Sequence, residues 1–466
     1  MTQSTNSGTS PSPEAIDQFR GQLRGPLITR SDPDYDEARK VHNGMIDRRP
    51  AMIAQCKDVA DVIACVNFGR ESRLDVSIRG GGHNAAGLGV CDDGLVIDLS
   101  TMNGVRVSPA DNTVRVEGGA VWGDVDHATH AFGRATPSGF ISTTGVGGLT
   151  LGGGVGNLSR GCGLTIDNLV SVDMVLADGS FVTANASENS DLFWAVRGGG
   201  GNFGVVTSFE FRTHPVGTVY AGPMLWPFEQ AGEIMRWYRD FIGNAPEELG
   251  GWIAVLNVPP GPPFPEEYHA KTVCGIVWCY TGPLDKAEEV FAPIRSAHPP
   301  AIDFVGPLPF PAFQGMFDAL VPKGIQSYWR ADFYAELPDE AIEKHIEFGG
   351  KLPTLVSAMH LYPIDGAPHR VGKTDTAFSY RDANWAGVIV GFSNDPADAD
   401  NMRSWVIDYW EALRPTSMGG AYVNFMMDEG EDRIKATYRD NYDRLLQVKQ
   451  RYDPANFFHV NQNIKP

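Results

Sequence analysis

The chain is short of positive charge and has no long apolar run. It contains 38 lysines and arginines against 57 aspartates and glutamates, a net charge of −19 over 466 residues. Because such a surface repels nucleic acid and anionic lipid, we expect neither as a partner and attribute the acidity to solubility. No stretch reaches the roughly 18 consecutive apolar residues that a membrane-spanning helix needs. We therefore expect no such helix.

Cysteine is scarce as well. The six cysteines are scattered and form no CxxC pair; they are Cys56, Cys65, Cys91, Cys162, Cys274 and Cys279. This pattern excludes a disulfide framework, and without a HExxH motif either we expect no metal site. The first residues, "MTQSTNSGTSPSPEA", are polar and lack the apolar core of a signal peptide. We expect residues 1–14 to be disordered and the protein to be cytoplasmic.

Glycine, in contrast, is abundant and clustered. Three clusters stand beside strand-like text: "RGGGHN" (79–84), "GVGGLTLGGGVG" (145–156) and "RGGGGNFG" (197–204). Glycine lets backbone N–H groups approach a ligand closely, and a concave row of such groups binds anions, pyrophosphate above all. One cluster alone is more typical of a turn, but three close together favour nucleotide binding. The Walker A and Rossmann motifs fail on spacing, so the nucleotide is bound in another way.

Periodicity divides the chain at about residue 215. Residues 45–215 mix α and β, with a helix starting near Asp58 and hairpin-like text at 94–118 and around Asp178-Gly179. Eight of the ten tryptophans lie between 216 and 419, where helical and strand-like stretches alternate. We interpret this segment as a second α+β domain that carries a sheet. We favour sheet and core packing for its tryptophans; the alternative is that one or two of them line an aromatic pocket.

Five ordered motifs carry a family resemblance. They are "SIRGGGHNAAG", "TTGVGGLTLGGGVG", "GLTIDNLVSVDMVLADGS", "DLFWAVRGGGGNFGVVTSFEF" and "VKQRYDPANFFHVNQNI". Together they resemble the berberine-bridge-enzyme-like flavoproteins of the vanillyl-alcohol-oxidase/p-cresol-methylhydroxylase superfamily, nearest to the bacterial branch that includes hydroxynicotine oxidase. The resemblance is close over 45–215 and 420–466, and extends to 216–419 only in layout.

The resemblance implies an α+β fold with two domains. An FAD-binding domain, residues 1–215 plus 420–466, would be interrupted by a substrate domain, residues 216–419, built on an antiparallel sheet. The flavin would lie where the domains meet. The expected partners are a small-molecule substrate and O2, and the sequence leaves the oligomeric state open.

The resemblance also explains the histidine that follows the first glycine cluster. In the family, this histidine is bonded covalently to the 8α-methyl carbon of FAD, and His83 occupies that position. A neutral imidazole is a suitable nucleophile for that reaction. Some members have a second, cysteinyl tether in the pattern GxCPxxGVGG, but this chain reads "GFISTTGVGG" with Ile141 at the cysteine position. We therefore expect a single histidyl bond, with Cys162 serving as a small apolar residue.

Other site residues are carried over by position. The FAD contacts implied are Arg79, Gly80, Gly81, Gly82, Asn84, Gly87, Gly145, Val146, Gly147, Gly148, Gly152, Val205, Val206, Asn461 and Asn463. Thr144 stands where the family controls oxygen access. "AYVNF" resembles the family's YxNY strand, which makes Tyr422 the first candidate for the catalytic base. Phe425 departs from the pattern at the second tyrosine. His360 and Tyr380 are second choices, and a structural role is an equal alternative for both.

The resemblance implies an FAD-linked oxidoreductase, with oxidase favoured over dehydrogenase. A hydride would leave a C–H bond next to an alcohol or amine for flavin N5, and O2 would accept the electrons. The substrate could be a cyclic amine, a sugar or a natural product. The alternatives are a flavin dehydrogenase with another acceptor and a non-catalytic protein that carries flavin or sequesters a ligand. An NADPH-dependent reductase of similar fold is disfavoured, because such reductases hold flavin without a covalent bond.

Overall fold

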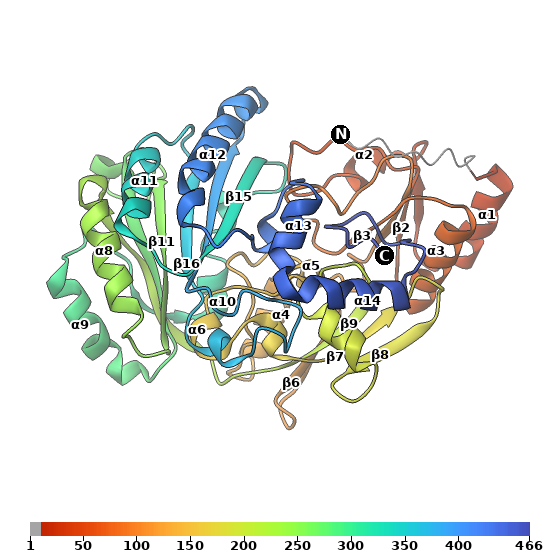
Figure 1. The fold of residues 1–466 in the computed structure, drawn as a ribbon, viewed down its shortest axis with the longest axis horizontal. Coiled ribbons are helices and arrows are strands. Elements are labelled where there is room, and N and C mark those ends of the chain that lie inside the picture. The colour runs from red at the N-terminus through yellow and green to blue at the C-terminus, as the bar shows by residue number, and fades with distance from the viewer. Residues whose placement is uncertain (1–10) are drawn as a thin grey trace.

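The computed structural model describes residues 11–466, which form three sheets and their covering helices (Figure 1). The first sheet has the strand order β1-β2-β4-β3, with β1 at Leu27–Thr29, β2 at Met52–Gln55, β4 at Leu95–Asp98 and β3 at Val76–Arg79. Helix α3 (Val59–Glu71) joins β2 to β3. It begins after Asp58, whose side chain accepts from the N–H groups of Ala60 and Asp61. The predicted helix start is confirmed.

The second sheet has five strands in the order β5-β6-β9-β7-β8. These are β5 (Val105–Ser108), β6 (Thr113–Glu117), β9 (Val205–Arg212), β7 (Leu169–Val175) and β8 (Phe181–Asn185). The hairpin predicted around Asp178-Gly179 is confirmed as β7–β8. The hairpin predicted over 94–118 is only partly right, because β5 and β6 pair with each other but β4 lies parallel between β2 and β3. All four residues of β4 are buried, as is typical of a parallel strand.

The third sheet lies entirely between residues 218 and 393. Its strands are β10 (Thr218–Pro227), β11 (Leu249–Asn257), β12 (Thr272–Tyr280), β13 (Ile302–Asp303), β14 (Gly306–Pro309), β15 (Gln326–Tyr334), β16 (Ala358–Pro363) and β17 (Trp385–Ser393). They pair antiparallel in the order β13-β10-β12-β11-β16-β17-β15, with β14 also on β10. This sheet falls within residues 216–419, and the domain division at those residues remains a prediction.

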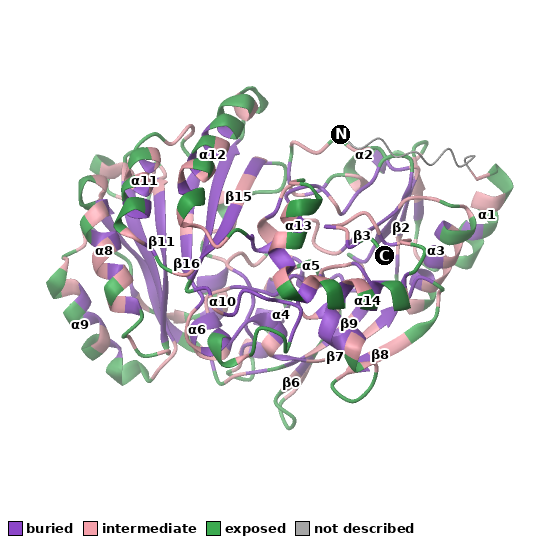
Figure 2. Ribbon diagram, viewed as in Figure 1, coloured by how far each residue is buried: buried purple, intermediate pink, exposed green. Residues whose placement is uncertain are grey.

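Four helices cover one face of this sheet, as Figure 1 shows: α8 (Ala231–Ile242), α9 (Ala287–Ala297), α11 (Asp339–Gly349) and α12 (Ala399–Leu413). Their apolar side chains pack with alternate strand residues such as Ile253 and Ile276 in one buried cluster. Figure 2 shows buried strands beneath helices whose outer surfaces are exposed. The opposite face of the sheet, with Trp252 and Val277, packs toward the rest of the molecule.

The C-terminal segment returns to the first part of the chain. It forms two helices, α13 (Glu431–Tyr438) and α14 (Tyr442–Tyr452), where the sequence predicted one from 431 onward. The break is at Arg439, whose φ of 44° is incompatible with a continuing right-handed helix. The buried Lys449 holds α14 in place, because its Nζ donates to Asp453 Oδ2 and to the backbone carbonyls of Asn202 and Phe458.

The remaining helices are short and lie along the first part of the chain and beside β14. They are α1 (Pro13–Gln22), α2 (Tyr35–Ala38), α4 (Trp122–His130), α5 (Val146–Leu151), α6 (Ser159–Cys162), α7 (Ser190–Val196) and α10 (Phe310–Gln314). Helix α1 starts inside the stretch expected to be disordered, and the rest of that expectation, residues 1–10, lies outside the described residues. From residue 11 onward, no helix has both the length and the apolar character needed to cross a membrane.

Candidate active site

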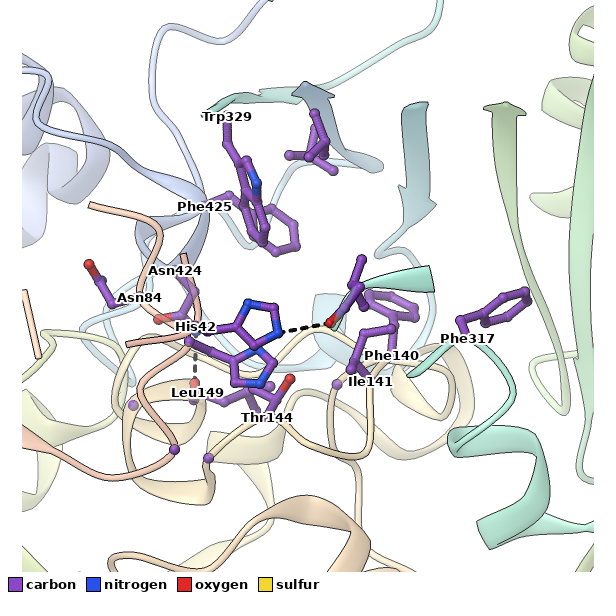
Figure 3. A pocket seen from close by; sticks show the side chains of 18 of the residues that line it. His42, Asn84, Phe140, Ile141, Thr144, Leu149, Phe317, Trp329, Asn424 and Phe425 are labelled. Atoms are coloured by element: carbon purple, nitrogen blue, oxygen red, sulfur yellow. Dashed lines mark hydrogen bonds between the residues drawn. The ribbon is translucent and has the colours of Figure 1, made fainter. Parts of the chain in front are cut away.

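A large cavity of about 880 Å³ separates the glycine clusters from the third sheet. Its lining residues run from His42 to Gln462 and come from both the N-terminal and the C-terminal parts of the chain. Figure 3 looks into it from close by. One side is glycine-rich backbone, and the other is built from residues of β10, β12, β11, β16, β17 and β15. This placement matches the expectation that the site lies between a cofactor side and a substrate side.

The glycine clusters meet at the cavity because their backbones touch. A Cβ added to Gly81 would lie 2.4 Å from the backbone N of Gly145, and one added to Gly145 would lie 2.3 Å from the N of Gly81. No residue with a side chain fits at either position. The third cluster contributes Gly200, Gly201 and Gly204 to the same lining. Three segments far apart in sequence thus form one backbone-lined wall.

This wall offers unpaired donors. Within residues 11–466, no group accepts a hydrogen bond from the N–H of Gly81, Gly82 or His83. Arg79 donates from Nη2 to Asp98 Oδ2 at 2.8 Å, while its buried Nη1 has no partner among the described residues. Buried polar groups are normally satisfied, so these donors indicate a site for an anionic ligand such as a diphosphate. The residues present therefore fit the FAD that the sequence implies.

His83 is held between two neighbours at the edge of this wall. Its Nε2 lies 3.1 Å from Thr143 Oγ1, and its ring stacks on the ring of His42 with centroids 3.9 Å apart. His42 is fixed in turn by a 2.9 Å hydrogen bond between its Nε2 and the carbonyl oxygen of Val321, drawn in Figure 3. Burial, together with the nearby His42, lowers the pKa of His83 to about 3. The imidazole is neutral at physiological pH, the form that can act as a nucleophile.

Most of the cofactor residues named from the sequence line the cavity. Those that do are Arg79, Gly80, Gly81, Gly82, His83, Asn84, Gly145, Gly147, Gly148, Val206 and Asn461. Those placed outside the lining are Gly87, Val146, Gly152, Val205 and Asn463. Two of these serve packing instead, because a side chain at Gly87 would meet Ile46 and one at Gly152 would meet Asn424.

Several lining residues were missed. Gln462 and Asn202 belong to quoted motifs but were given no role, and Asn424 stands within "AYVNF". Asn202 connects two of these segments, since its Nδ2 donates to the backbone oxygens of Gly199 and Gln462. Asn461, which the sequence did name, lies beside them, and its buried Oδ1 has no partner in the described part of the chain. The sequence feature that could have identified Gln462 is the polar run "NQNI", which the structure brings against the third glycine cluster.

Tyr422 lines the cavity, but its hydroxyl is engaged by the protein. The hydroxyl oxygen accepts from the N–H of Gly154 at 2.8 Å, from the N–H of Val155 at 3.2 Å and from Asn424 Nδ2 at 2.7 Å. The residue precedes a 3₁₀ turn, Val423–Phe425, and is not on the strand that the sequence predicted. Burial raises the pKa of Tyr422, and these hydrogen bonds only partly oppose that effect. Its geometry is that of a structural acceptor.

Tyr380 lies away from the cavity. Its hydroxyl donates to the carbonyl oxygen of Ala436 at 2.9 Å, and its ring stacks on Phe333 with centroids 4.5 Å apart. The guanidinium of Arg439 covers the ring at 3.6 Å from its centroid. "TAFSYR" forms a loop, so the predicted strand there is wrong. Every part of this side chain is used in packing.

His360 lies on β16 and faces the cavity, as does Tyr362 two residues later. His360 Nδ1 and the Tyr362 hydroxyl are 2.8 Å apart, and Trp252 contacts both rings. Burial lowers the pKa of His360 to about 4 and raises the pKa of Tyr362. Tyr362 was not named from the sequence, although the spacing in "HLY" places it on the same strand face. Phe140 stacks on its ring with centroids 4.0 Å apart.

The remaining predicted positions are nearby. Thr144 and Ile141 both line the cavity, and Figure 3 shows them in the same loop region as Phe140. Cys162 is half-buried and outside the lining. Two tryptophans, Trp252 and Trp329, line the cavity, as the alternative interpretation expected. Others such as Trp226 and Trp278 are fully buried in the core.

Comparison with known proteins agrees with this geometry. Residues 50–185 match a family model described as an FAD binding domain, and residues 421–465 match one described as berberine and berberine like. An FAD-linked oxidoreductase of Dictyostelium discoideum is 31% identical over 97% of this chain and 97% of its own length.

Two solved structures show the same fold. The structure of 6-hydroxy-D-nicotine oxidase from Arthrobacter nicotinovorans has a TM-score of 0.84 and 25% identity, covering 95% of this chain and 98% of its own. Xylooligosaccharide oxidase from Myceliophthora thermophila has a TM-score of 0.85 and 24% identity, covering 97% and 99%. The predicted two-domain α+β flavoprotein fold is therefore confirmed. The chain is an FAD-dependent oxidoreductase and belongs to the berberine-bridge-enzyme-like family.

Proposed function

We propose that this enzyme is an oxidase that converts a secondary or primary alcohol to the carbonyl compound, with O2 as the electron acceptor. The C–H and O–H bonds of the carbinol break, and one alcohol plus one O2 give one carbonyl compound plus one hydrogen peroxide. The observation that carries the proposal is the His360–Tyr362 pair on the sheet side of the cavity, opposite the glycine wall that fits FAD. The chemistry supplied by bound FAD is two-electron oxidation, in which a hydride leaves the substrate carbon and O2 finally accepts both electrons.

His360 is the proton acceptor in this proposal. Its low pKa keeps it neutral, and its Nδ1 is occupied by Tyr362. Nε2 is the nitrogen left for the substrate hydroxyl, whose proton it takes as the hydride departs. Tyr362 fixes the orientation of the ring by accepting from Nδ1–H. Tyr422 is the weaker candidate, because three N–H donors already surround its oxygen.

His83 is the covalent attachment point for FAD in this proposal. Thr143 occupies Nε2 of the imidazole, so Nδ1 is the nitrogen available to form the bond. A single tether follows from Ile141, which lines the cavity where a cysteine would provide the second. Thr144, in the same loop, is the position at which we expect oxygen access to be controlled.

Anaerobic mixing of the purified holoenzyme with a panel of alcohols, amines and sugars tests the reaction. We expect the flavin absorbance near 450 nm to bleach with alcohols, to return on admission of air, and to give one hydrogen peroxide per carbonyl product. Bleaching that air does not reverse but a quinone does would identify a dehydrogenase. A flavin that no compound bleaches would identify a carrier. Either result would overturn the oxidase proposal.

The role of His360 has its own test. His360→Asn keeps a polar group of smaller size but removes the base, and we expect the rate constant for flavin bleaching to fall about 100-fold or more. The matched control is His345→Asn. His345 is also a buried histidine, but it bonds Tyr409 on the helix-covered face of the third sheet, away from the cavity. A loss of similar size in both variants would mean that His360 acts only through packing.

A further inference from the structure

We propose that the substrate is an uncharged, flat and largely apolar alcohol of two to three fused rings. This inference rests on the proposed function and names the substrate class of that same site. It follows from the shape of the sheet side of the cavity, from the side chains along it and from the charges that are missing there.

Two small residues, Ala254 and Gly275, lie in a row across the sheet between His360 and Leu225. The strand register pairs His360 with Ala254, Ala254 with Gly275, and Gly275 with Leu225. The row thus runs across four strands, β16, β11, β12 and β10, over three strand spacings or about 14 Å. We call this row the trough. Its length suits a rigid system of two to three fused rings with its hydroxyl at the His360 end.

Aromatic side chains stand along the trough and beyond its His360 end. Phe140 and Trp252 lie at the His360 end, where their ring centroids are 5.7 Å apart, and Phe317 lies 5.6 Å from Trp252. Trp329 and Phe425, seen together in Figure 3, form a second edge-on pair at 5.6 Å; Trp329 is on β15, so this pair lies beyond His360 at the end away from the trough. Flat aromatic ligands pack against such edges and faces better than the puckered rings of sugars do.

The cavity offers no partner to a charged substrate. Among the described residues that line it there is no aspartate, glutamate or lysine. The only arginine in this described lining is Arg79, which is paired with Asp98 on the glycine side. Burial keeps His360 and His83 neutral by lowering the pKa of each. A protonated amine or a carboxylate on the sheet side would lose its hydration without gaining a counter-ion, so the structure disfavours both.

The sheet side has free hydrogen-bonding groups at only two places, the His360–Tyr362 pair and Trp329, so it suffices for about two hydroxyl groups. Trp252 already donates its Nε1 to Asn157, and Asn257 is satisfied by Thr272 and by the carbonyl oxygen of Thr354. His360, Tyr362 and the buried Nε1 of Trp329, which has no partner among the described residues, remain. An oligosaccharide would bury several hydroxyls without partners. Phe304, Met316 and Leu355, which line the cavity, are also 37%, 37% and 42% exposed, an apolar entrance suited to a lipophilic molecule.

A matched series of ligands tests the proposal on the unmodified holoenzyme. The probes are 9-anthracenemethanol, its cationic analogue 9-(aminomethyl)anthracene, the anion 9-anthracenecarboxylate, and xylobiose. Binding to the oxidised enzyme is measured by the change in flavin absorbance, so it does not require turnover. We expect the neutral alcohol to bind at least tenfold more tightly than each charged analogue and than xylobiose. Equal or tighter binding of any of these three would overturn the proposal.

Gly275→Val tests the trough itself. The added Cβ would come within 2.7 Å of Leu225 Cδ2, a movable side-chain end, and would fill the row between Ala254 and Leu225. We expect the affinity ratio of 9-anthracenemethanol to benzyl alcohol to fall at least tenfold. Phe181→Ser, at an exposed residue of strand β8 outside the cavity lining, should leave the ratio unchanged. An unaltered ratio in a folded Gly275→Val would overturn the assignment of the trough.

Failure of this proposal and failure of the proposed function give different results. If the neutral ligand binds but never bleaches the flavin, the substrate class stands and the oxidase chemistry is wrong. If xylobiose bleaches the flavin and outcompetes the aromatic alcohol, the chemistry stands and the substrate class is wrong. Should Gly275→Val not fold, Leu225→Phe closes the far end of the trough and the same ratio is measured.

Discussion

Two neutral histidines on opposite sides of the cavity have different neighbours and therefore different uses. His83 is stacked on another histidine and bonded to Thr143, beside backbone N–H groups that have no acceptor in residues 11–466. His360 is bonded to a tyrosine and surrounded by aromatic rings. Burial lowers the pKa of both below the ordinary value of histidine. In the proposed function, these neighbours suit His83 to forming the bond to FAD and His360 to accepting a proton from the substrate.

The attachment through His83 has a direct test. Acid precipitation of the unmodified protein should carry the yellow colour into the pellet, and His83→Ala should leave it in the supernatant. The control is Cys162→Ala, which should keep the flavin with the protein because Cys162 lies outside the cavity lining. Release of flavin from the Cys162 variant alone would show that the anchor is misassigned.

The pH dependence of flavin bleaching distinguishes His360 from Tyr422. A base works in its deprotonated form, and the pKa of His360 is about 4. The rate constant should therefore be constant from about pH 8 down to about pH 6 and fall tenfold per unit below about pH 4. Anaerobic stopped-flow measurements over this range provide the check. A rate that instead climbs toward pH 10 would identify a tyrosine, whose ordinary pKa lies there.

Tyr422→Phe should lower stability more than it lowers activity. The change leaves the buried N–H groups of Gly154 and Val155 without their acceptor, a cost of about 1–3 kcal/mol in the free energy of unfolding. Urea denaturation measures this cost, and the bleaching rate constant should change by less than about threefold. The control is Tyr238→Phe, because the buried hydroxyl of Tyr238 has no partner among the described residues. A 100-fold loss of rate in a stable Tyr422→Phe would restore Tyr422 as the base.

At the scale of elements, close packing of two glycine loops forms the cofactor wall. The loop after β3 and the loop before α5 approach until Gly81 and Gly145 are in backbone contact. A single methyl group at this point would have to separate the loops, since the atoms it meets are backbone and cannot rotate away. The wall therefore requires glycine at both Gly81 and Gly145, because no side chain larger than a hydrogen atom fits there.

Gly145→Ala should abolish FAD binding. We expect the variant to purify colourless or to be insoluble, with the ratio of absorbance at 450 nm to that at 280 nm close to zero. Gly243→Ala is the control, because a Cβ at Gly243 has nothing within 4 Å and the residue is distant from the cavity. A yellow Gly145→Ala protein would show that the loops can move apart without loss of the site.

Local sequence predicted the elements well where one signal was strong. Asp58 marks the start of α3, and the alternation around Asp178-Gly179 marks the β7–β8 hairpin. The predictions were wrong where tertiary contacts decide. "GLVIDLS" reads like a hairpin strand, yet β4 is buried between two parallel partners. The break between α13 and α14 at Arg439 could not be predicted from a nearby glycine or proline, because the sequence has neither there. "AYVNF" was taken for a strand and forms a turn because Tyr422 bonds to distant backbone.

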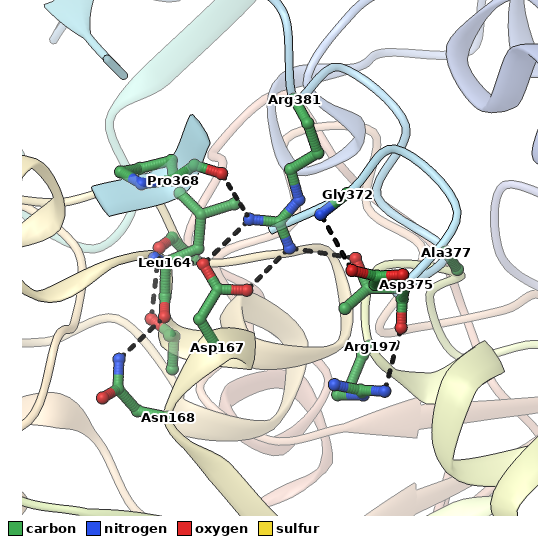
Figure 4. A network of polar contacts seen from close by, with 12 residues as sticks. Leu164, Asp167, Asn168, Arg197, Pro368, Gly372, Asp375, Ala377 and Arg381 are labelled. Atoms are coloured by element: carbon green, nitrogen blue, oxygen red, sulfur yellow. Dashed lines mark hydrogen bonds and ion pairs between the residues drawn. The ribbon is translucent and has the colours of Figure 1, made fainter. Parts of the chain in front are cut away.

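At the scale of the whole molecule, buried ion pairs join segments that are remote in sequence. Figure 4 shows Arg381, on the loop between β16 and β17, reaching Asp167 beside the second glycine cluster. Arg381 Nη1 and Nη2 lie 2.8 and 2.6 Å from the two carboxylate oxygens of Asp167. Nη2 also donates to Thr376 Oγ1 at 2.9 Å. This bidentate pair fixes the substrate side against the cofactor side.

Arg381→Leu should be strongly destabilising, because it leaves the Asp167 carboxylate buried without its partner. We expect the free energy of unfolding to fall by about 3–5 kcal/mol, measured by urea denaturation of the flavin-bound enzyme. The matched control is Arg370→Leu, which breaks the exposed pair with Glu247 and should cost no more than about 1 kcal/mol. Comparable costs for the two variants would contradict the joining role of Arg381.

The sequence alone predicted more of the residues on the glycine side of the cavity than of those on its sheet side. His83 and the glycine clusters belong to motifs of contiguous residues, so the local sequence suffices to identify them. The sheet side is assembled from one residue in two on six strands, and its composition depends on the strand register. Tyr362 and Gly275 acquire their roles only when β16, β11 and β12 lie side by side. No motif of contiguous residues encodes that neighbourhood.

The cavity joins His42 and the first glycine loop to Asn461 and Gln462. A nascent polypeptide that has exposed only the first loop still lacks the far wall, so it cannot yet retain the cofactor. We therefore expect flavin colour in the purified protein to report chains whose two ends have come together at the cavity. Purified chains that end before Asn461 should be colourless.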